Sequence, residues 1–223
     1  MLLTQIFTVL KDRPTYLWQY MRGTLHFLRC KALSPLFLNK KKVLLGSNVR
    51  FQSLTNFLAA SPESSISVGA DSVIYEHARL EAYGSGNISV GASSILGDTR
   101  IVSRAKITLG ARTLTSWNVM IQDFDPHPLS QELRAQQVEK MAQDFFPRWT
   151  GKTSLTAINW QAPTQEIWMG DDVWLGAQSI ILKGTRIGSG SIVAAGSVVT
   201  GGDFPERSLI AGNPARWIKE LPL

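Results

Sequence analysis

The sequence predicts a mainly β protein in which short strands wind into a parallel coil. Aliphatic side chains recur at every sixth position near the C-terminus, at Met169, Leu175, Ile181, Ile187, Val193 and Val199. The fourth position after each is nearly always small: Val173, Ser179, Thr185, Ser191, Ser197 and then Asp203. A helix needs spacings of three and four, and a half-buried strand alternates by two over one short run. A period of six therefore indicates a short strand followed by a turn, repeated so that the aliphatic positions stack into a continuous core.

An earlier block of the chain follows the same rhythm. Its aliphatic positions are Val68, Ile74, Leu80, Val90, Leu96, Val102, Leu109, Thr115 and Ile121. Three units of six bring the chain back above its start, and the longer step from Val68 to Val90 means that one coil carries extra residues. The count stops after residue 127 and resumes near residue 167. We therefore expect a coil domain over residues 45–221 with an insertion over 128–166, preceded by a separate segment over residues 1–44.

Charge and cysteine content limit the functions that this chain can have. Residues 1–50 hold nine Lys and Arg against one acid, Asp12, leaving 14 basic and 16 acidic residues of the 23 and 17 in the chain. The basicity thus belongs to the N-terminal segment, and we expect no nucleic-acid partner. Cys30 is the only cysteine, which excludes an intrachain disulfide and favours a reducing compartment. No apolar run reaches the roughly 18 residues needed to span a bilayer, so a cytoplasmic protein is expected.

The N-terminal segment predicts an amphipathic helix over residues 15–33. Pro14 can open this helix, and Pro35 lies beyond its end. One interpretation is a helix that caps the open end of the coil, as stacks of this kind require. The other is peripheral contact with the inner face of a membrane, with Tyr16 and Trp18 at the headgroups and the cationic run 39–42 on anionic lipid. The two interpretations are compatible and both stay open.

The insertion predicts a helix followed by irregular chain. Residues 130–146 read "SQELRAQQVEKMAQDFF", and one apolar side is expected from Leu133, Val138, Met141, Ala142 and Phe145. We expect the insertion to cover a ligand-binding site, with Trp149 or Trp160 near the ligand.

Three motifs carry a resemblance to a known family. "DDVWLGA", "AAGSVVT" and "AGNPAR" occur in that order within residues 166–221, and "ITLGARTLTSWNVMIQDFDPHPL" occupies 107–129. Together they resemble the hexapeptide-repeat acyltransferases, among them maltose and galactoside acetyltransferases and the O-acetyltransferases of bacterial surface polysaccharides. The resemblance implies a left-handed parallel β-helix, a homotrimer with active sites between adjacent coils, and acetyl-CoA as co-substrate.

The resemblance also implies roles for individual residues. The family's catalytic histidine, found just before a proline, corresponds to His127. Residues of the C-terminal coils would hold acetyl-CoA: Gly176 and Ala177 beside the pantetheine, Ala195 and Thr200 toward the nucleotide, and Arg216 and Lys219 at the phosphates. Many relatives carry lysine after that threonine; here the position is Gly201, so one expected phosphate contact is missing or replaced.

The implied chemistry is transfer of an acetyl group to a sugar hydroxyl. A hydroxyl is a poor nucleophile near neutral pH, and histidine suits the task of general base because much of it is neutral there. Asp123, Asp125 or a backbone carbonyl could orient the ring of His127. Asn118 and Trp117 are candidates for contacting the acceptor, although Trp117 could equally pack between subunits.

Other histidines and other functions compete with this interpretation. His77 lies inside a repeat and could contact substrate, whereas His26 lies in the basic N-terminal segment. A zinc-dependent hydratase needs three imidazole ligands, and the three histidines of this chain do not share ligand-like spacing, so no metal is expected. N-acetylation of an amino sugar and a non-catalytic structural coil remain as alternatives to O-acetylation of a bacterial glycan or its precursor.

Overall fold

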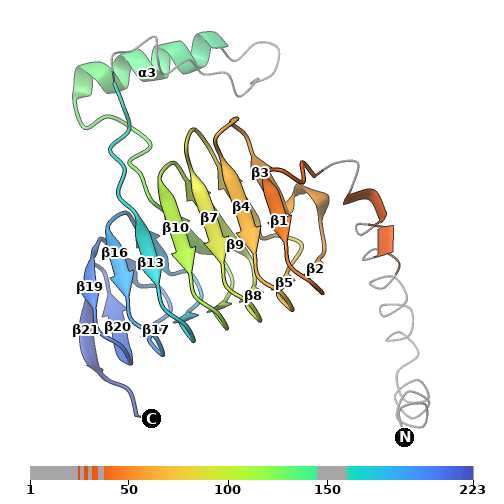
Figure 1. The fold of residues 1–223 in the computed structure, drawn as a ribbon. Helices are drawn as coiled ribbons and strands as arrows, with labels where there is room; N and C mark the ends of the chain where they lie inside the picture. The colour runs from red at the N-terminus through yellow and green to blue at the C-terminus, as the bar shows by residue number, and fades with distance from the viewer. Residues whose placement is uncertain (1–24, 26–27, 30–31, 35–37, 145–159, 223) are drawn as a thin grey trace, which may run out of the picture.

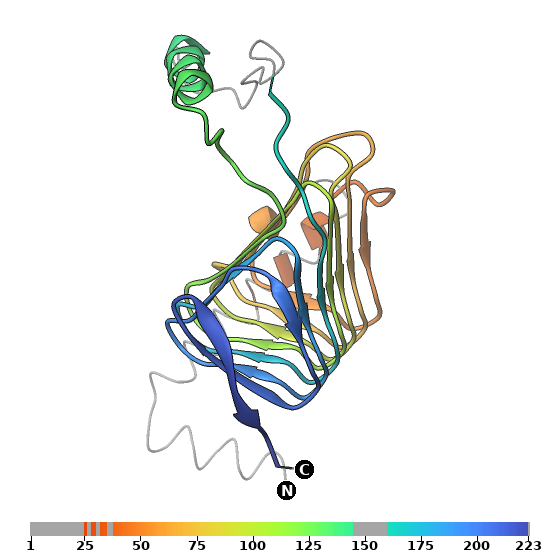
Figure 2. The ribbon, with the colours of Figure 1, turned by 90° about the vertical axis from the view of Figure 1, so that its left-hand side faces the viewer.

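The protein is a coil of parallel strands with one projecting arm (Figure 1). The computed structural model describes residues 25, 28–29, 32–34, 38–144 and 160–222. The chain passes through three walls in succession, and each wall is a sheet whose neighbouring strands come from successive turns of the coil. Seen along the coil, the three walls form a triangular section (Figure 2).

The three walls are named here sheets A, B and C. Sheet A contains β1 (Val43–Leu45), β4 (Ser65–Val68), β7 (Asn87–Val90), β10 (Lys106–Leu109), β13 (Ile167–Met169), β16 (Thr185–Ile187) and β19 (Gly202–Phe204). Sheet B contains β2 (Arg50–Phe51), β5 (Val73–Ile74), β8 (Ile95–Leu96), β11 (Leu114–Thr115), β14 (Trp174–Leu175), β17 (Ile192–Val193), β20 (Ser208–Gly212) and the antiparallel β21 (Ala215–Glu220). Sheet C contains β3 (Phe57–Ala59), β6 (Arg79–Ala82), β9 (Thr99–Ser103), β12 (Val119–Gln122), β15 (Ile180–Leu182) and β18 (Val198–Val199). A short 3-10 helix, η1 (Leu54–Asn56), precedes β3.

Turns at three corners join the walls, and two of these corners matter for function. The BC corner, between sheets B and C, comprises residues 75–78, 97–98, 116–118, 176–179 and 194–197. The CA corner, between sheets C and A, comprises residues 60–64, 83–86, 104–105, 183–184 and 200–201, and the arm leaves from it over residues 123–166.

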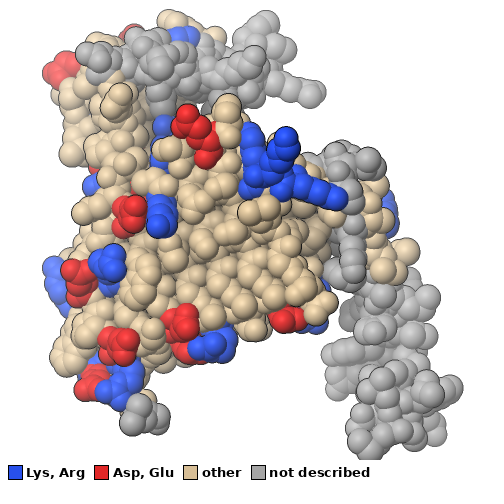
Figure 3. Space-filling model, viewed as in Figure 1, with Lys and Arg blue, Asp and Glu red and all other residues tan. Residues whose placement is uncertain are grey.

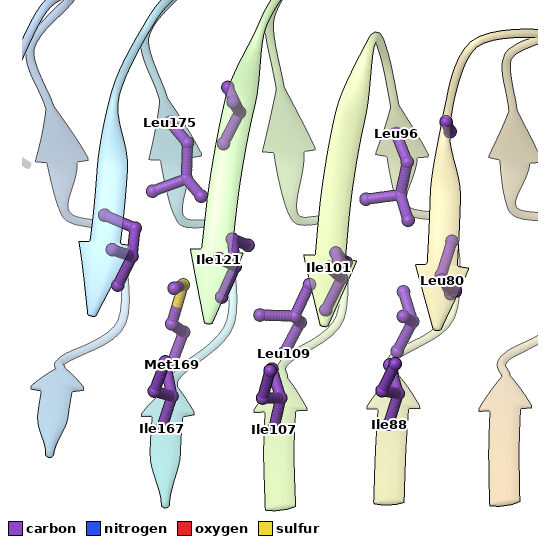
Figure 4. Close-up of a cluster of buried hydrophobic side chains, with 14 of the residues drawn as sticks. Leu80, Ile88, Leu96, Ile101, Ile107, Leu109, Ile121, Ile167, Met169 and Leu175 are labelled. Atoms are coloured by element: carbon purple, nitrogen blue, oxygen red, sulfur yellow. The ribbon is translucent and has the colours of Figure 1, made fainter. Parts of the chain in front are cut away.

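The stacking predicted from the C-terminal repeat is confirmed. Met169 pairs with Ile187, Leu175 with Val193 and Ile181 with Val199, each one turn of the coil further on. All six side chains are fully buried, and so are the small residues from Val173 to Ser197, whereas Asp203 is exposed. Met169 and Leu175 lie in the interior together with side chains of the earlier block such as Leu96, Leu109 and Ile121 (Figure 4). The fold is a mainly β parallel solenoid, consistent with the left-handed β-helix that the resemblance implies.

The predicted register is wrong by one residue in one coil. Ile101, not Val102, pairs with Leu80 on one side and Ile121 on the other, and its side chain is fully buried. The reason is the short BC corner at residues 97–98, which brings sheet C back one residue earlier than a strict count of six allows.

Glycine follows sheet A in six coils because the next coil lies too close for a side chain. These residues are Gly46, Gly69, Gly91, Gly110, Gly170 and Gly188. At each, an added Cβ would lie closer than 3.0 Å to a backbone atom of the following coil. The backbone at these positions is otherwise ordinary, so glycine is required for space and not for its conformational freedom.

The outer face of sheet A carries few charges (Figure 3). Three of its outward positions on neighbouring coils are Ser67, Ser89 and Thr108, which are half-buried hydroxyl residues. Sheet B differs: Ile95, Leu114 and Trp174 form an exposed apolar column on its outer face. The two walls therefore offer chemically distinct surfaces.

The arm carries the predicted helix, α3 (Gln131–Asp144), which stands away from the coil in both ribbon views (Figures 1 and 2). The expected apolar side of this helix is wrong at two positions, because Val138 is 60% exposed and Ala142 is also exposed, whereas Gln137, which was not expected on that side, is 3% exposed. Phe145 and Trp149 lie outside the described residues.

The predicted N-terminal helix also falls mostly outside the described residues, although residues 25, 28–29 and 32–34 are helical. Leu38, just beyond it, packs against the core at the first coil. Within the described part of the chain, no helix has the length and apolar character needed to cross a membrane.

Candidate active site

His127 lies near the base of the arm, just beyond the point where its two legs pair. The Asp125 backbone N–H donates to the Pro163 carbonyl at 2.9 Å, and the Gln165 N–H donates to the Asp123 carbonyl at 2.9 Å. The exposed imidazole of His127 is held by Gln137 of α3, whose Oε1 lies 2.9 Å from Nδ1. The second ring nitrogen, Nε2, is the one that this contact leaves for chemistry.

Neither candidate aspartate orients the ring in this structure. Both carboxylates have other partners: Asp125 forms an ion pair with Lys183 at 3.3 Å, and Asp123 is turned into the coil. Asp123 is fully buried and accepts hydrogen bonds from the Ser103 hydroxyl at 2.6 Å and from the backbone N–H groups of Arg104 at 2.8 Å and Ala105 at 3.0 Å. Burial raises the pKa of this carboxyl, and the three donors partly offset that effect. Asp123 therefore links the first residues of the arm to the CA corner of the preceding coil through hydrogen bonds.

We expect Asp123→Ala to lower the free energy of unfolding by about 2 kcal/mol, because it leaves buried backbone N–H groups without an acceptor. Thermal unfolding followed by circular dichroism measures this loss. The pH profile of the surviving activity should keep its shape, since Asp123 does not contact His127. A profile displaced along the pH axis would instead mean that this carboxylate acts on the imidazole.

A second site lies on sheet B and the BC corner. It is an open groove of about 470 Å³ whose walls are largely aromatic and aliphatic. Trp117 is 71% exposed, Tyr75 48% and Trp174 44%, and the Trp174 indole N–H donates to the Ser116 hydroxyl at 3.2 Å. Polar groups stand between these faces: Gln52, Glu76, His77, Asp98 and Ser116. Aromatic faces interspersed with hydroxyl, amide and carboxylate groups suit a polar ring with apolar C–H faces, such as a sugar.

The groove contains two residues that the sequence flagged and several that it did not. Trp117 and His77 both line it, as proposed for substrate contact, whereas Tyr75 and Trp174 were missed. The signal for Trp174 was present in the chain: Ile95, Leu114 and Trp174 each precede a buried position of sheet B and so point outward. Apolar residues at the outward position of three successive coils predict an exposed apolar patch, and such a patch indicates a ligand-binding or protein-binding surface.

Asn118 and Trp160, the remaining described acceptor candidates, lie outside the lining of the groove. Asn118 is exposed and adopts a left-handed backbone conformation with φ of 57°, which asparagine tolerates better than most residues. Its position is thus explained by the turn of the BC corner. Trp160 is half-buried on the returning leg of the arm.

The candidate donor residues gather mainly on the BC corner, in the coils that follow the groove. Gly176 and Ala177 lie on this corner one coil after Trp117, and Ala195 lies one coil further. A Cβ at Gly176 would stand 2.5 Å from the Ala195 backbone nitrogen, so the corner is as closely stacked here as it can be. Arg216 and Lys219 are exposed on β21, at the end of sheet B. Thr200 lies apart from the others, exposed on the CA corner.

Comparison with known proteins identifies the repeats of the C-terminal coils. Residues 166–201 match the family model described as bacterial transferase hexapeptide (six repeats). The coil is built of hexapeptide repeats. No curated protein matches the chain.

Solved structures of acyltransferases are similar to this chain at low sequence identity. An N-acyltransferase from Bacillus cereus, in complex with dTDP and 3-hydroxybutyryl-CoA, is 20% identical over 85% of this chain and 89% of its own, with a TM-score of 0.56. A hexapeptide-repeat acetyltransferase from Vibrio cholerae is 20% identical over 91% of this chain and 94% of its own, with a TM-score of 0.51. A maltose O-acetyltransferase from Clostridium difficile is 22% identical over 90% of this chain and 89% of its own, with a TM-score of 0.45.

The hexapeptide coil thus distributes the candidate residues over two corners. The aromatic groove, Gly176 and Ala195 lie at the BC corner, whereas His127 and Thr200 lie at the CA corner, with the whole width of sheet C between them. A single chain therefore does not bring the histidine to the groove. Among the described residues, no three His, Cys, Asp or Glu side chains come together as they would to hold a metal ion.

Proposed function

We propose that this protein is an acetyl-CoA-dependent acetyltransferase that transfers an acetyl group to a hydroxyl of a bacterial glycan or its sugar precursor. The observation that carries the proposal is the His127 imidazole, bound through one ring nitrogen to Gln137 and exposed on an arm of a hexapeptide coil. An inert coil has no use for a histidine held in this way. The aromatic groove on the BC corner supplies the acceptor surface that such a base requires.

We propose that the site is completed between copies of the chain in a homotrimer. Leu129, two residues after His127, is 90% exposed, and Val138 on α3 is 60% exposed, so the arm carries apolar side chains that its own coil does not cover. The outer face of sheet B carries an apolar column of its own. If the CA corner of one copy meets the BC corner of the next, His127 reaches the groove and both apolar surfaces are buried. Repetition of one such head-to-tail contact closes a ring of three when each contact rotates the chain by one third of a turn.

In the proposed reaction, Nε2 of His127 accepts the proton of the acceptor hydroxyl. The hydroxyl oxygen attacks the thioester carbonyl carbon, the carbon–sulfur bond breaks, and the CoA thiolate leaves and recovers the proton from the imidazolium. Transfer is direct, because the thioester is already activated and a covalent acyl-enzyme is not needed.

Acetyl-CoA is proposed to lie along the BC corner beyond the groove. Gly176, Ala177 and Ala195 carry no bulky side chain there, and Arg216 and Lys219 on β21 would meet the phosphates. Thr200 would come from the CA corner of the neighbouring copy.

The alternative is N-acylation of an amino sugar, which the fold likeness to the Bacillus cereus N-acyltransferase favours. Thiol release from acetyl-CoA, measured over a panel of sugars and amino sugars, tests both activities. Mild alkali then separates the products, because an acetyl ester is hydrolysed while an acetamide resists. Absence of thiol release with every sugar would leave the structural coil as the better reading.

We expect Trp117→Ala to raise the KM for the sugar acceptor about fivefold, the equivalent of about 1 kcal/mol for a lost aromatic face. The KM for acetyl-CoA should not change, because Trp117 lies in the coil before the donor residues. Steady-state kinetics with each substrate varied in turn checks this. If the variant instead ceased to form trimers at an unchanged acceptor KM, Trp117 would be an interface residue.

The basic N-terminal segment is proposed to cap the coil, to contact an anionic membrane surface, or to do both. The arm is proposed to shape acceptor specificity. Trp149 and Trp160 remain candidates for that role.

A further inference from the structure

The arm holds a buried glutamine, Gln137, whose side chain contacts the candidate base His127. Gln137 is 3% exposed, although the residues on either side of it on α3, Gln136 and Val138, are exposed. Its amide makes two contacts: Oε1 with Nδ1 of His127 at 2.9 Å, and Nε2 with the Pro126 carbonyl oxygen at 3.4 Å. Gln137 is thus a buried amide on a helix that is mostly exposed, and both ends of the amide have a partner, which indicates a specific role in the arm.

The Pro126 contact decides which end of the amide faces the imidazole. A carbonyl oxygen can only accept a hydrogen bond, so the NH₂ group of Gln137 must face Pro126. The amide oxygen then faces His127, and because this oxygen also only accepts, Nδ1 must carry the proton. In the neutral ring Nε2 is left with its lone pair.

The charged groups around the base of the arm have partners other than the ring. Asp125 pairs with Lys183, Glu132 accepts from the Ser130 hydroxyl, and Arg134 donates to the Pro128 carbonyl at 2.9 Å and the Leu129 carbonyl at 3.0 Å. Arg134 thus clamps the turn that follows His127 from the same helix that carries Gln137. The side chain that hydrogen-bonds the imidazole is Gln137, and it is neutral.

We infer that Gln137 is a positioning residue that holds His127 in the Nδ1–H tautomer and presents Nε2 as the base. A carboxylate in its place would favour the charged imidazolium, whereas an amide fixes the tautomer without that effect. The catalytic part of this inference rests on the proposed function; the tautomer itself does not.

Nitrogen-15 spectra of the full-length protein, labelled at histidine, test the tautomer without any activity. The chain has three histidines, and His127→Ala identifies the signals of residue 127. Above the titration range we expect the wild-type ring in the Nδ1–H form and Gln137→Met to shift it toward Nε2–H, the form that an unconstrained histidine prefers. Gln136→Met, the same change on the exposed face of α3, should leave the spectrum as in the wild type. A wild-type ring in the Nε2–H form, or one that Gln137→Met does not alter, overturns the inference.

Kinetics test what the tautomer does. We expect Gln137→Met to lower kcat about tenfold, since part of the benefit of a well-placed base is lost, while the KM for acetyl-CoA is unchanged. Gln137→Glu keeps an acceptor for the same N–H but adds a negative charge, so the acidic limb of the kcat/KM profile should move up by about one pH unit.

The role of Gln137 is contradicted if the acidic limb of the kcat/KM profile stays at the same pH in Gln137→Glu. It is also contradicted if Gln136→Met lowers kcat as much as Gln137→Met does. If Gln137→Met does not fold, the Glu variant decides. If the wild-type protein transfers no acetyl group to any sugar, the proposed function fails, and the tautomer spectrum alone then decides the inference.

Discussion

Replacing His127 with alanine is expected to lower kcat for acetyl transfer at least about a hundredfold, because a positioned general base typically contributes ~10²- to 10⁴-fold. The KM for acetyl-CoA should stay near the wild-type value, since the proposed donor residues lie on the BC corner and the histidine on the arm. Thiol release at saturating acceptor, in the variant and the wild type, measures the effect. The variant should fold normally, because the His127 side chain is exposed.

His77→Ala is the matched control, because it removes the same side chain from the wall of the groove. A base and a binding residue differ in which constant they change: loss of a base lowers kcat, whereas loss of an acceptor contact raises the acceptor KM. If kcat fell about a hundredfold in His77→Ala and hardly changed in His127→Ala, His77 would be the general base and His127 would not.

The core of this fold was predictable because the same positions are buried in every turn of the coil. Every inward position is covered by the same position one turn later, so each must be aliphatic or small, and Met169, Leu175 and Ile181 show this spacing in the bare sequence. Corner length is under no such constraint. The BC corner at 97–98 is shorter than its neighbours, and the chain around it does not reveal that Ile101 and not Val102 faces inward.

The site was predictable in part, and the limit has a physical cause. His127 was chosen as the candidate base because its place just before a proline matches the catalytic histidine of the family it resembles, and because the repeat stops there. Its partner Gln137 lies ten residues further along an arm whose path depends on how the helix folds back, and glutamine is an ordinary residue on an exposed helix. Asp123 was one of three candidates for orienting the ring because it lies close to His127 in sequence. In the structure its carboxylate turns the other way and accepts hydrogen bonds from two backbone N–H groups of the preceding coil.

The second large effect is expected at Gly91, where even one methyl group should separate two coils. A Cβ at this position would stand 2.6 Å from Cα of Ala111, and the atoms it meets are backbone, which cannot rotate away. Relief requires β7 and β10 to move apart, weakening their parallel ladder and the hydrogen bond from the Gly91 N–H to the Leu109 carbonyl. We expect Gly91→Ala to cost about 3 kcal/mol, at the upper end for overpacking, and to lower the unfolding midpoint by roughly 6–12 °C.

Gly84→Ala is the control that distinguishes a glycine needed for close stacking of two coils from a glycine needed for a left-handed backbone. Gly84 has a φ of +60° and nothing within 4 Å of an added Cβ, so alanine there costs only the left-handed backbone, about 1 kcal/mol. Circular dichroism of both variants during heating compares the two costs in one coil. The stacking argument predicts the larger loss at Gly91 even though its backbone suits alanine. Equal losses, or a greater one at Gly84, would show that the coils can separate freely, and glycine at this corner would then need another explanation.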